Sequence, residues 1–136
     1  MNVFVDSSVW FAAANANDRY NQRAKQLLSD LPGRLTTDHV IVETWLLLNS
    51  RVGRHAAEGF WRAIKGASEV ENATAADVDA GWAITDRFAD QSFSIVDRTS
   101  FAVMERLGIT RAASFDRDFS IYRYGRNRER AFEILR

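Results

Sequence analysis

The chain has 136 residues, a hydrophobic fraction of 46%, a formal net charge of zero and no cysteine. This length corresponds to one domain, and the apolar content excludes a disordered protein. The absence of cysteine excludes disulfide bonds, thiolate-bound zinc and thiol nucleophiles. No apolar stretch approaches the roughly 20 residues that a membrane-spanning helix needs, and the first residues do not resemble a signal peptide. We therefore expect a single domain over residues 1–136, located in the cytoplasm, with no membrane partner.

Charge is distributed unevenly along the chain. Residues 117–136 contain six arginines against three acids, an excess of three positive charges, so the remainder carries three excess negative charges. A basic C-terminal segment of this kind is typical either of a solvated tail or of a surface that contacts a polyanion. The charge alone leaves both interpretations open.

In the first half of the chain, short β-prone segments alternate with longer helical patterns. The first strand is indicated by the apolar run Val3–Val5, and Pro32 with Gly33 ends the second helix. Asp38 is a candidate N-cap for the helix that follows. We expect strands at 2–6 and 35–37, and helices at 7–14, 19–31, 40–52 and 55–65.

The second half continues the alternation. Thr74 and Asp77 have the spacing of a capping box, and Gly108 is placed to end a later helix. After Asp116 the pattern weakens, although the apolar residues of the last five positions should fold back onto the body. We expect strands at 69–72, 94–97 and 111–115, and helices at 74–89 and 99–107.

Strands that alternate with helices predict a parallel sheet covered by helices on both faces. We therefore expect the α/β class, with a three-layer α/β/α sandwich. Its short central sheet should contain four to five strands and be mostly parallel.

Three acids follow predicted strands directly. Asp6, Asp97 and Asp116 each stand at the carboxyl end of one, in the sequences VFVD, SIVD and ASFD. A single aspartate in this position often only caps the next helix. Carboxyl ends of parallel strands share one edge of the sheet, where binding crevices form. The repeated placement therefore indicates a functional site, with Asp6 and Asp97 on adjacent strands.

A fourth acid, Glu43, lies in the predicted helix 40–52 among apolar neighbours, so we expect it near the buried face. A glutamate in that environment needs a polar partner or a metal ion. His39, one turn earlier, either orients Glu43 through a hydrogen bond or is an ordinary surface histidine.

Converging carboxylates favour a bound cation. Two carboxylates about 4 Å apart repel by roughly 4 kcal/mol at an effective dielectric of about 20. Several together therefore take up protons or bind a metal ion. Oxygen ligands without cysteine select Mg²⁺ or Mn²⁺ over zinc. Such an ion suits phosphodiester hydrolysis, because it activates water and neutralises charge on the leaving group.

Four segments together resemble the PIN-domain nucleases, specifically the VapC-type toxins of bacterial toxin–antitoxin pairs. The resemblance covers nearly the whole chain. The first segment is the opening strand with its Asp-Ser-Ser turn, and the second carries Glu43 in a helix. The third and fourth lie in one stretch that carries Asp97 and Asp116. The residues are VFVDSSVWFA, TTDHVIVETWLLL and FSIVDRTSFAVMERLGITRAASFDRDF.

The resemblance implies a Mg²⁺- or Mn²⁺-dependent endoribonuclease, usually a homodimer, that a cognate antitoxin protein inhibits. It implies Asp6 and Asp97 as metal ligands, with Glu43 and Asp116 completing the acidic catalytic site. Ser8 would position Asp6 or a water.

Asp118 falls outside the family motif, so we interpret it as surface charge. Trp10 is expected in the core. Trp45, Trp61 and Trp82 are expected in the core or at a dimer interface.

Three other functions fit the same architecture. A receiver-like phospho-acceptor domain would need paired acids after the first strand and a late lysine, whereas Asp6 is followed by two serines and the last lysine is Lys65. A haloacid-dehalogenase-type phosphatase would need an aspartate where Ser8 stands. A non-catalytic binding module with a structural cation site is the remaining alternative.

Overall fold

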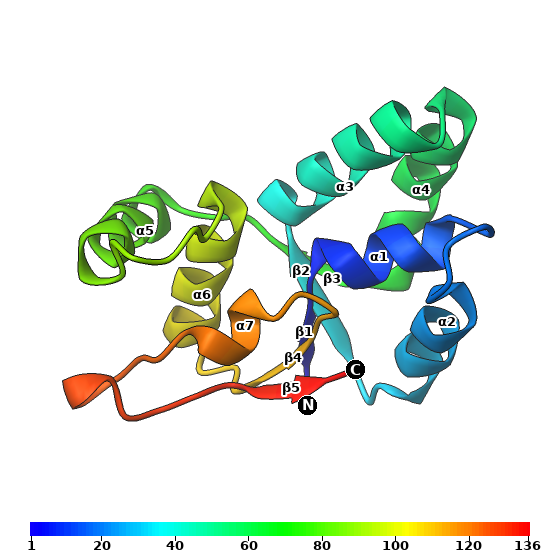
Figure 1. Cartoon of the computed structure of the whole chain (residues 1–136). Helices are drawn as coiled ribbons and strands as arrows, with labels where there is room; N and C mark the ends of the chain where they lie inside the picture. The colour runs from blue at the N-terminus through cyan, green and yellow to red at the C-terminus, as the bar shows by residue number, and fades with distance from the viewer.

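A five-stranded, all-parallel sheet forms the centre of the fold in the computed structural model, which describes residues 1–136 (Figure 1). The strand order is β3-β2-β1-β4-β5. All three residues of β1 are completely buried, as suits a strand in the middle of a sheet that is covered on both faces. The strands are β1 (Val3–Val5), β2 (Arg34–Thr37), β3 (Glu69–Glu71), β4 (Arg111–Ala113) and β5 (Glu133–Leu135).

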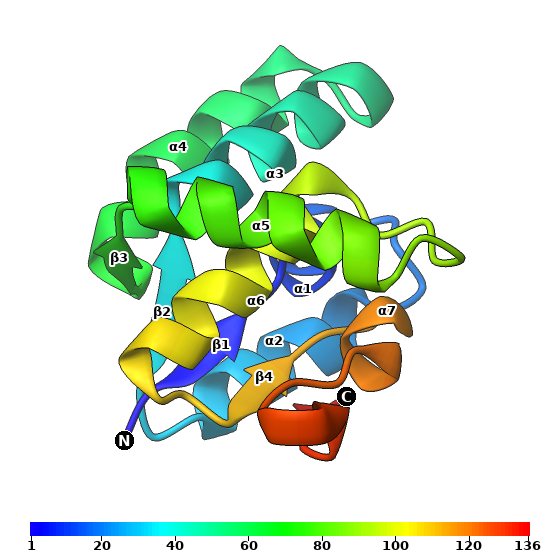
Figure 2. The same cartoon turned by 90° about the vertical axis from the view of Figure 1, so that its left-hand side faces the viewer.

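Helices cover both faces of this sheet. Figure 2 shows α5 and α6 in front of the strands, with α1 and α2 behind them. The expected three-layer α/β/α sandwich is therefore confirmed. The helices are α1 (Ser7–Ala14), α2 (Asn21–Asp30), α3 (Asp38–Arg51), α4 (Arg54–Ala67), α5 (Ala75–Arg87), α6 (Ile95–Leu107) and α7 (Asp118–Ile121), with a 3₁₀ turn at Arg126–Arg128. None of these helices is both long and apolar enough to span a membrane.

An aromatic cluster joins α6 and α7 to the end of the chain. The ring of Phe101 stacks on Tyr122 with centroids 4.2 Å apart and meets Phe119 edge-on at 4.9 Å. Phe132 packs on Tyr124 at 4.7 Å. The C-terminal residues thus fold back onto the body as expected, and they form β5, a strand whose short sequence carried no clear periodicity.

The predicted strand at 94–97 is wrong. These residues are the start of α6, with Ser94 as N-cap and Asp97 at the third helical position. The Asp97 N–H donates to Ser94 Oγ at 3.0 Å, and the Ser94 N–H donates to Asp97 Oδ2 at 3.1 Å. Ile95 is 70% exposed, so its apolar side chain does not belong to a buried strand. An apolar pair followed by an acid fits either the end of a strand or the start of a helix. The capping box stabilises the helix start here.

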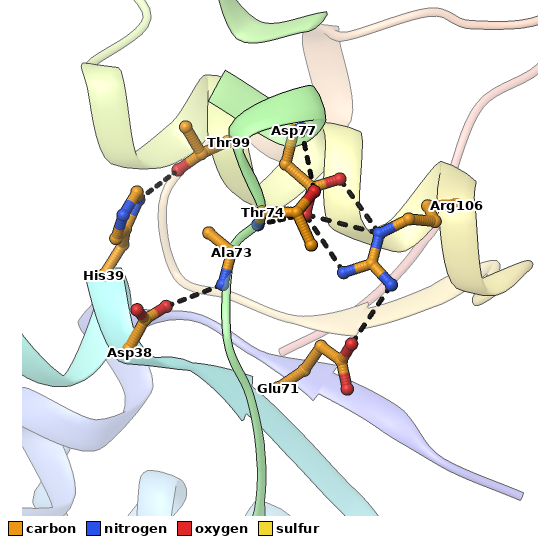
Figure 3. Close-up of polar contacts among 8 residues, drawn as sticks. All are labelled: Asp38, His39, Glu71, Ala73, Thr74, Asp77, Thr99 and Arg106. Atoms are coloured by element: carbon orange, nitrogen blue, oxygen red, sulfur yellow. Dashed lines mark hydrogen bonds and ion pairs between the residues drawn. The ribbon is translucent and has the colours of Figure 1, made fainter. Parts of the chain in front are cut away.

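The predicted N-cap of the third helix is off by one residue. Thr37 caps α3, because its side chain accepts from the Val40 N–H, and Asp38 is the first helical residue. Asp38 accepts instead from the Ala73 N–H at 2.9 Å, a contact that fixes the connection between β3 and α5 (Figure 3). The predicted third strand is confirmed as β3, which pairs with β2.

The order of the strands determines where a site can form. β1 lies between β2 and β4, so the connection from β3 to β4 carries the chain across to the other side of β1. In open parallel sheets, the carboxyl ends of the strands at such a switch point border a crevice. Asp6 directly follows β1, and Ser114 directly follows β4.

Candidate active site

A cleft of about 510 Å³ opens at this switch point. It is bordered by α1, α3, the start of α6 and the loop between β4 and α7. Arg51 is the only basic side chain that lines it. Six acids line it, namely Asp6, Asp18, Glu43, Asp97, Asp116 and Asp118. The structure thus brings all four predicted acids into one cleft and adds two more.

Asp6 is held in a single orientation by serine hydroxyls. It is the N-cap of α1 and only 2% exposed. Its Oδ2 accepts from Ser8 Oγ at 2.8 Å and from Ser114 Oγ at 3.0 Å. Ser8 Oγ also accepts from the Phe115 N–H at 2.9 Å, which ties α1 to the segment after β4. The expected contact between Ser8 and Asp6 is therefore present.

Ser114 was missed by the sequence interpretation. It is completely buried, and its hydroxyl accepts from the Asp116 N–H at 3.0 Å while it donates to Asp6. One side chain therefore links two acids that are 110 positions apart. The signal in the sequence was a small hydroxyl residue two positions before the fourth acid.

Glu43 reaches the cleft from α3 and accepts a hydrogen bond from Ser7 Oγ. Its surroundings are less buried than predicted, because the neighbouring Val42 and Leu46 are 55% and 56% exposed. His39 does not orient Glu43. Its Nδ1 lies 3.0 Å from the Thr99 hydroxyl, a contact that joins α3 to α6 (Figure 3).

A close group of three acids comes from α6, the loop after β4 and the start of α7. Asp97, Asp116 and Asp118 each present one carboxylate oxygen, and these atoms lie within 4.8 Å of one another. The Asp118 N–H donates to Asp116 Oδ1 at 2.9 Å, which folds the loop so that both side chains line the cleft. The interpretation of Asp118 as surface charge is therefore wrong. Its position two residues after Asp116 was a signal for such a turn.

Burial and mutual repulsion raise the pKa values of three acids in this cleft. Burial raises the pKa of Asp6 to about 6, although hydrogen bonds from Ser8 and Ser114 oppose the rise. Burial, together with the nearby charge of Asp6, raises the pKa of Asp97 far above its ordinary value. Burial and the charge of Asp116 also raise the pKa of Asp118. A cation in the cleft would displace the protons that these groups retain.

The donor set fits a hard divalent cation. Every acidic side chain in the cleft offers oxygen, the chain has no cysteine, and neither histidine lines the cleft. Carboxylate oxygens select Mg²⁺-like ions, whereas zinc sites are built mainly from cysteine and histidine. The buried, closely spaced carboxylates also need positive charge to ionise together.

Comparison with known proteins identifies the class. The PIN domain family matches residues 3–124. The chain is 43% identical over 121 residues to the 23S rRNA-specific endonuclease VapC20 of Mycobacterium tuberculosis, in two strains, over 87% of this chain and 92% of the relative. A crystal structure of M. tuberculosis VapC20, described as a sarcin–ricin loop cleaving toxin, matches with a TM-score of 0.83 and 42% identity. That match covers 88% of this chain and 93% of the other.

The chain therefore belongs to the PIN-domain family. PIN domains are metal-dependent nucleases, and the relative at 43% identity is named as an RNA endonuclease. The prediction of a divalent-metal-dependent endoribonuclease, the RNA-cleaving toxin of a toxin–antitoxin pair, is confirmed. The receiver-like, phosphatase and non-catalytic alternatives are not supported.

Proposed function

We propose that this toxin cleaves large-subunit ribosomal RNA within the sarcin–ricin loop. The observation that carries the proposal is the convergence of the acids in one cleft, in a chain 43% identical to a 23S rRNA-specific endonuclease. The metal is Mg²⁺ or Mn²⁺, because the donors are all oxygen. The catalytic and metal-binding residues are Asp6, Glu43, Asp97 and Asp116, with Asp118 added and Ser8 in support.

The acids and the serines of the cleft have different tasks in this proposal. Asp97, Asp116 and Asp118 supply the closest set of oxygens for the cation, and Asp6 borders the same space. When bound, the ion activates water for in-line attack and neutralises charge on the phosphate. The hydroxyls of Ser8 and Ser114 keep the Asp6 carboxylate fixed. Such positioning lowers the cost of organising the site before reaction.

Arg51 supplies the positive charge that faces the substrate within the cleft. It extends from the last turn of α3, and its guanidinium lies 5.8 Å from the centroid of the Phe11 ring. A guanidinium can bind a phosphate with two parallel hydrogen bonds. Arg51 therefore suits a phosphate next to the scissile bond.

We also propose that the protein acts in the cytoplasm as a homodimer and binds a cognate antitoxin protein. Trp61 and Trp82 are 54% and 69% exposed, so they are not core residues, whereas Trp10 is buried as predicted. Val42, Leu46 and Trp61 line one surface hollow, and a contiguous apolar patch of this kind marks a protein contact. The exposed large apolar side chains on α3 to α6 are Val42, Leu46, Trp61, Trp82, Ile95 and Leu107. Light scattering on a size-exclusion column tests the dimer, and a monomer at micromolar concentration would refute it.

The function is tested with purified protein and a synthetic sarcin–ricin stem-loop RNA. We expect one cut that leaves a 5′-phosphate, that requires Mg²⁺ or Mn²⁺ and that a chelator abolishes. A stem-loop with scrambled loop sequence is the matched control substrate and should remain intact. Cleavage that survives chelation, or that persists in the Asp6→Asn, Asp97→Asn double variant, would disprove the assignment.

A further inference from the structure

The segment between α7 and β5 forms a well-anchored hairpin of residues 122–132, which we call the arginine hairpin. Its arms pair through Tyr124 and Arg130, whose backbone groups exchange hydrogen bonds of 3.0 and 3.1 Å. At its base, Tyr124 stacks on Phe132, and the buried Tyr122 packs on both rings. Figure 1 shows this orange-to-red segment extending from the body on the side of α5 and α6. The hairpin is therefore fixed at its base and presents its turn to the outside.

The turn carries three arginines and one exposed acid, Glu129, and none of the three arginines forms an ion pair. Arg126, Arg128 and Arg130 are exposed, and none has a carboxylate within 4.0 Å. The arginines that form ion pairs are Arg54, Arg106 and Arg111. The guanidinium of Arg128 rests 5.2 Å from the centroid of the Phe88 ring. These side chains are available to an anionic ligand without first breaking an ion pair.

The backbone of the turn is unusual. Asn127 and Arg128 both have positive φ, at 65° and 54°, and Gly125 has a φ of 82°. Asparagine tolerates the left-handed region, whereas an arginine rarely occupies it. Non-glycine residues in this region concentrate at functional segments, where the surroundings hold them in place. Here the left-handed pair reverses the chain so that Arg126, Arg128 and Arg130 lie around one tight turn.

The cleft is mostly negatively charged, so an RNA strand needs a positively charged surface elsewhere on the protein. Six acids line the cleft against the single Arg51, and the chain outside residues 117–136 carries three excess negative charges. An RNA strand is a polyanion, and its affinity comes largely from phosphate contacts to Arg and Lys. Asp118 lines the cleft and lies only four residues before Tyr122, where the arginine hairpin begins. We expect an RNA whose scissile phosphate is in the cleft to extend its flanking nucleotides towards the hairpin.

The arginines of the turn also lie outside the residues that the PIN domain match covers. The PIN domain match ends at residue 124, before the first of the three arginines. We propose that the arginine hairpin binds the phosphate backbone of the RNA substrate outside the cleft, a proposal that rests on the RNA-cleaving function above. The ligand class is a flexible or looped RNA strand, whose phosphates accept paired hydrogen bonds from the guanidinium groups. The hairpin contributes to binding and not to the chemical step.

The test removes the three charges and compares that variant with a matched control. The hairpin variant is Arg126→Gln, Arg128→Gln, Arg130→Gln. The control, Arg54→Gln, Arg62→Gln, Lys65→Gln, removes three exposed charges from α4, which lies on the other side of the fold (Figure 1). Binding of a fluorescein-labelled sarcin–ricin stem-loop is measured by anisotropy in the Asp97→Asn background with Mg²⁺ at several salt concentrations. Cleavage constants are measured in the active background.

We expect the hairpin variant to raise Kd and KM by about tenfold at moderate salt, with kcat unchanged. The slope of log K against log salt should fall in magnitude by about 2 to 3, which is roughly one for each phosphate that the variant no longer neutralises. The control variant should stay within about twofold of the parent protein. Replacement of the three arginines by lysine should retain most of the salt dependence, because the charge is kept.

The outcomes separate this proposal from the function that it rests on. Equal Kd, KM and salt slope in the hairpin and control variants would overturn the role of the hairpin and leave the nuclease function intact. A loss of kcat without a change in KM would also overturn it. A parent protein that cuts no RNA, yet binds it in a hairpin-dependent way, would refute only the nuclease assignment. A hairpin variant that binds RNA normally but loses binding to polyglutamate would assign the surface to an acidic protein segment instead.

Discussion

Two helices of this protein begin with the same local motif and have different surroundings. α5 starts with Thr74 as N-cap and Asp77 at the third position, and α6 starts with Ser94 and Asp97 in the same relation. Both form complete capping boxes, and both aspartates are buried, at 2% and 6% exposure. The local hydrogen bonds are therefore equivalent, and the difference lies in what else each carboxylate meets.

Asp77 forms an ion pair with a positively charged side chain, Arg106. The Nε of Arg106 donates to Asp77 Oδ1 at 3.0 Å, and a second guanidinium nitrogen donates to Oδ2 at 3.0 Å (Figure 3). The same guanidinium pairs with Glu71 at 3.1 Å, so one arginine joins α6 to β3 and α5. Although burial opposes it, this pairing and the capping bonds hold the pKa of Asp77 below its ordinary value.

Asp97 meets other acids and no cation, and its pKa is raised by burial and by Asp6. The contrast teaches that a buried capping aspartate is structural when the fold supplies its counter-charge. It becomes a candidate metal ligand when the fold places no positively charged side chain beside it.

The largest expected effect is on catalysis. Asp97→Asn should lower kcat for RNA cleavage by about 10³-fold, because it removes a charge on which metal binding depends. Asp77→Asn should leave kcat within about threefold, since Asp77 does not line the cleft. Single-turnover cleavage of the stem-loop RNA at saturating Mg²⁺ measures both. The contrast fails if the two variants lose activity equally while both remain folded by circular dichroism.

The second effect is on stability, where Asp77→Asn should be the more harmful of the two substitutions. Asp77→Asn should lower the free energy of unfolding by about 2–3 kcal/mol, because it leaves Arg106 without its principal partner. That change corresponds to a melting temperature lower by about 5–10 °C. Asp97→Asn should instead raise the melting temperature of the metal-free protein by about 5 °C, since it relieves repulsion. Thermal denaturation in chelator tests both signs, and a stabilised Asp77→Asn variant would contradict the structural role.

The third effect is a pH dependence of metal-free stability. A carboxyl group whose pKa is raised by folding binds its proton more tightly in the native state, so stability falls as pH rises through the native pKa. For Asp6 the fall runs from about pH 4 to about pH 6, and for Asp97 it extends further upward. The lowered pKa of Asp77 acts oppositely, since its contribution is present above its unfolded pKa and is lost on acidification below about pH 4.

The melting temperature in chelator should therefore be highest near pH 4 and fall by several degrees towards pH 8. Saturating Mg²⁺ should remove most of this fall, because the bound cation replaces the protons. Asp97→Asn should flatten the curve in the same way. A metal-free melting temperature that rises between pH 5 and pH 8 would show that the acids of the cleft are not in repulsion.

Much of this fold could be predicted from local patterns. The apolar run Val3–Val5 predicted the central strand, and the Thr74 to Asp77 spacing predicted the start of α5. The acids after β1 and β4 were found because parallel strands place their carboxyl ends at one edge. These features depend only on residues that are close in sequence or on a general rule of sheet geometry.

The rest depended on tertiary contacts. Residues 94–97 are too few to separate a strand from a capped helix by periodicity. Arg106 pairs with Asp77 across 29 positions, so the sequence did not distinguish that aspartate from Asp97. Asp118 joins the cluster only because of the turn after Asp116, and β5 exists only through its pairing with β4.

The smallest expected effect tests the shared motif itself. Thr74→Ala and Ser94→Ala each remove the side-chain acceptor of one N-cap, at 3.2 and 3.0 Å from the N–H of Asp77 and Asp97. Each should lower stability by about 1 kcal/mol, the usual value for such a cap. Only Ser94→Ala should also affect cleavage, by a few-fold in kcat, because only its helix start carries an acid of the cleft. Equal losses of kcat in both variants would mean that helix stability, and not the position of Asp97, limits the reaction.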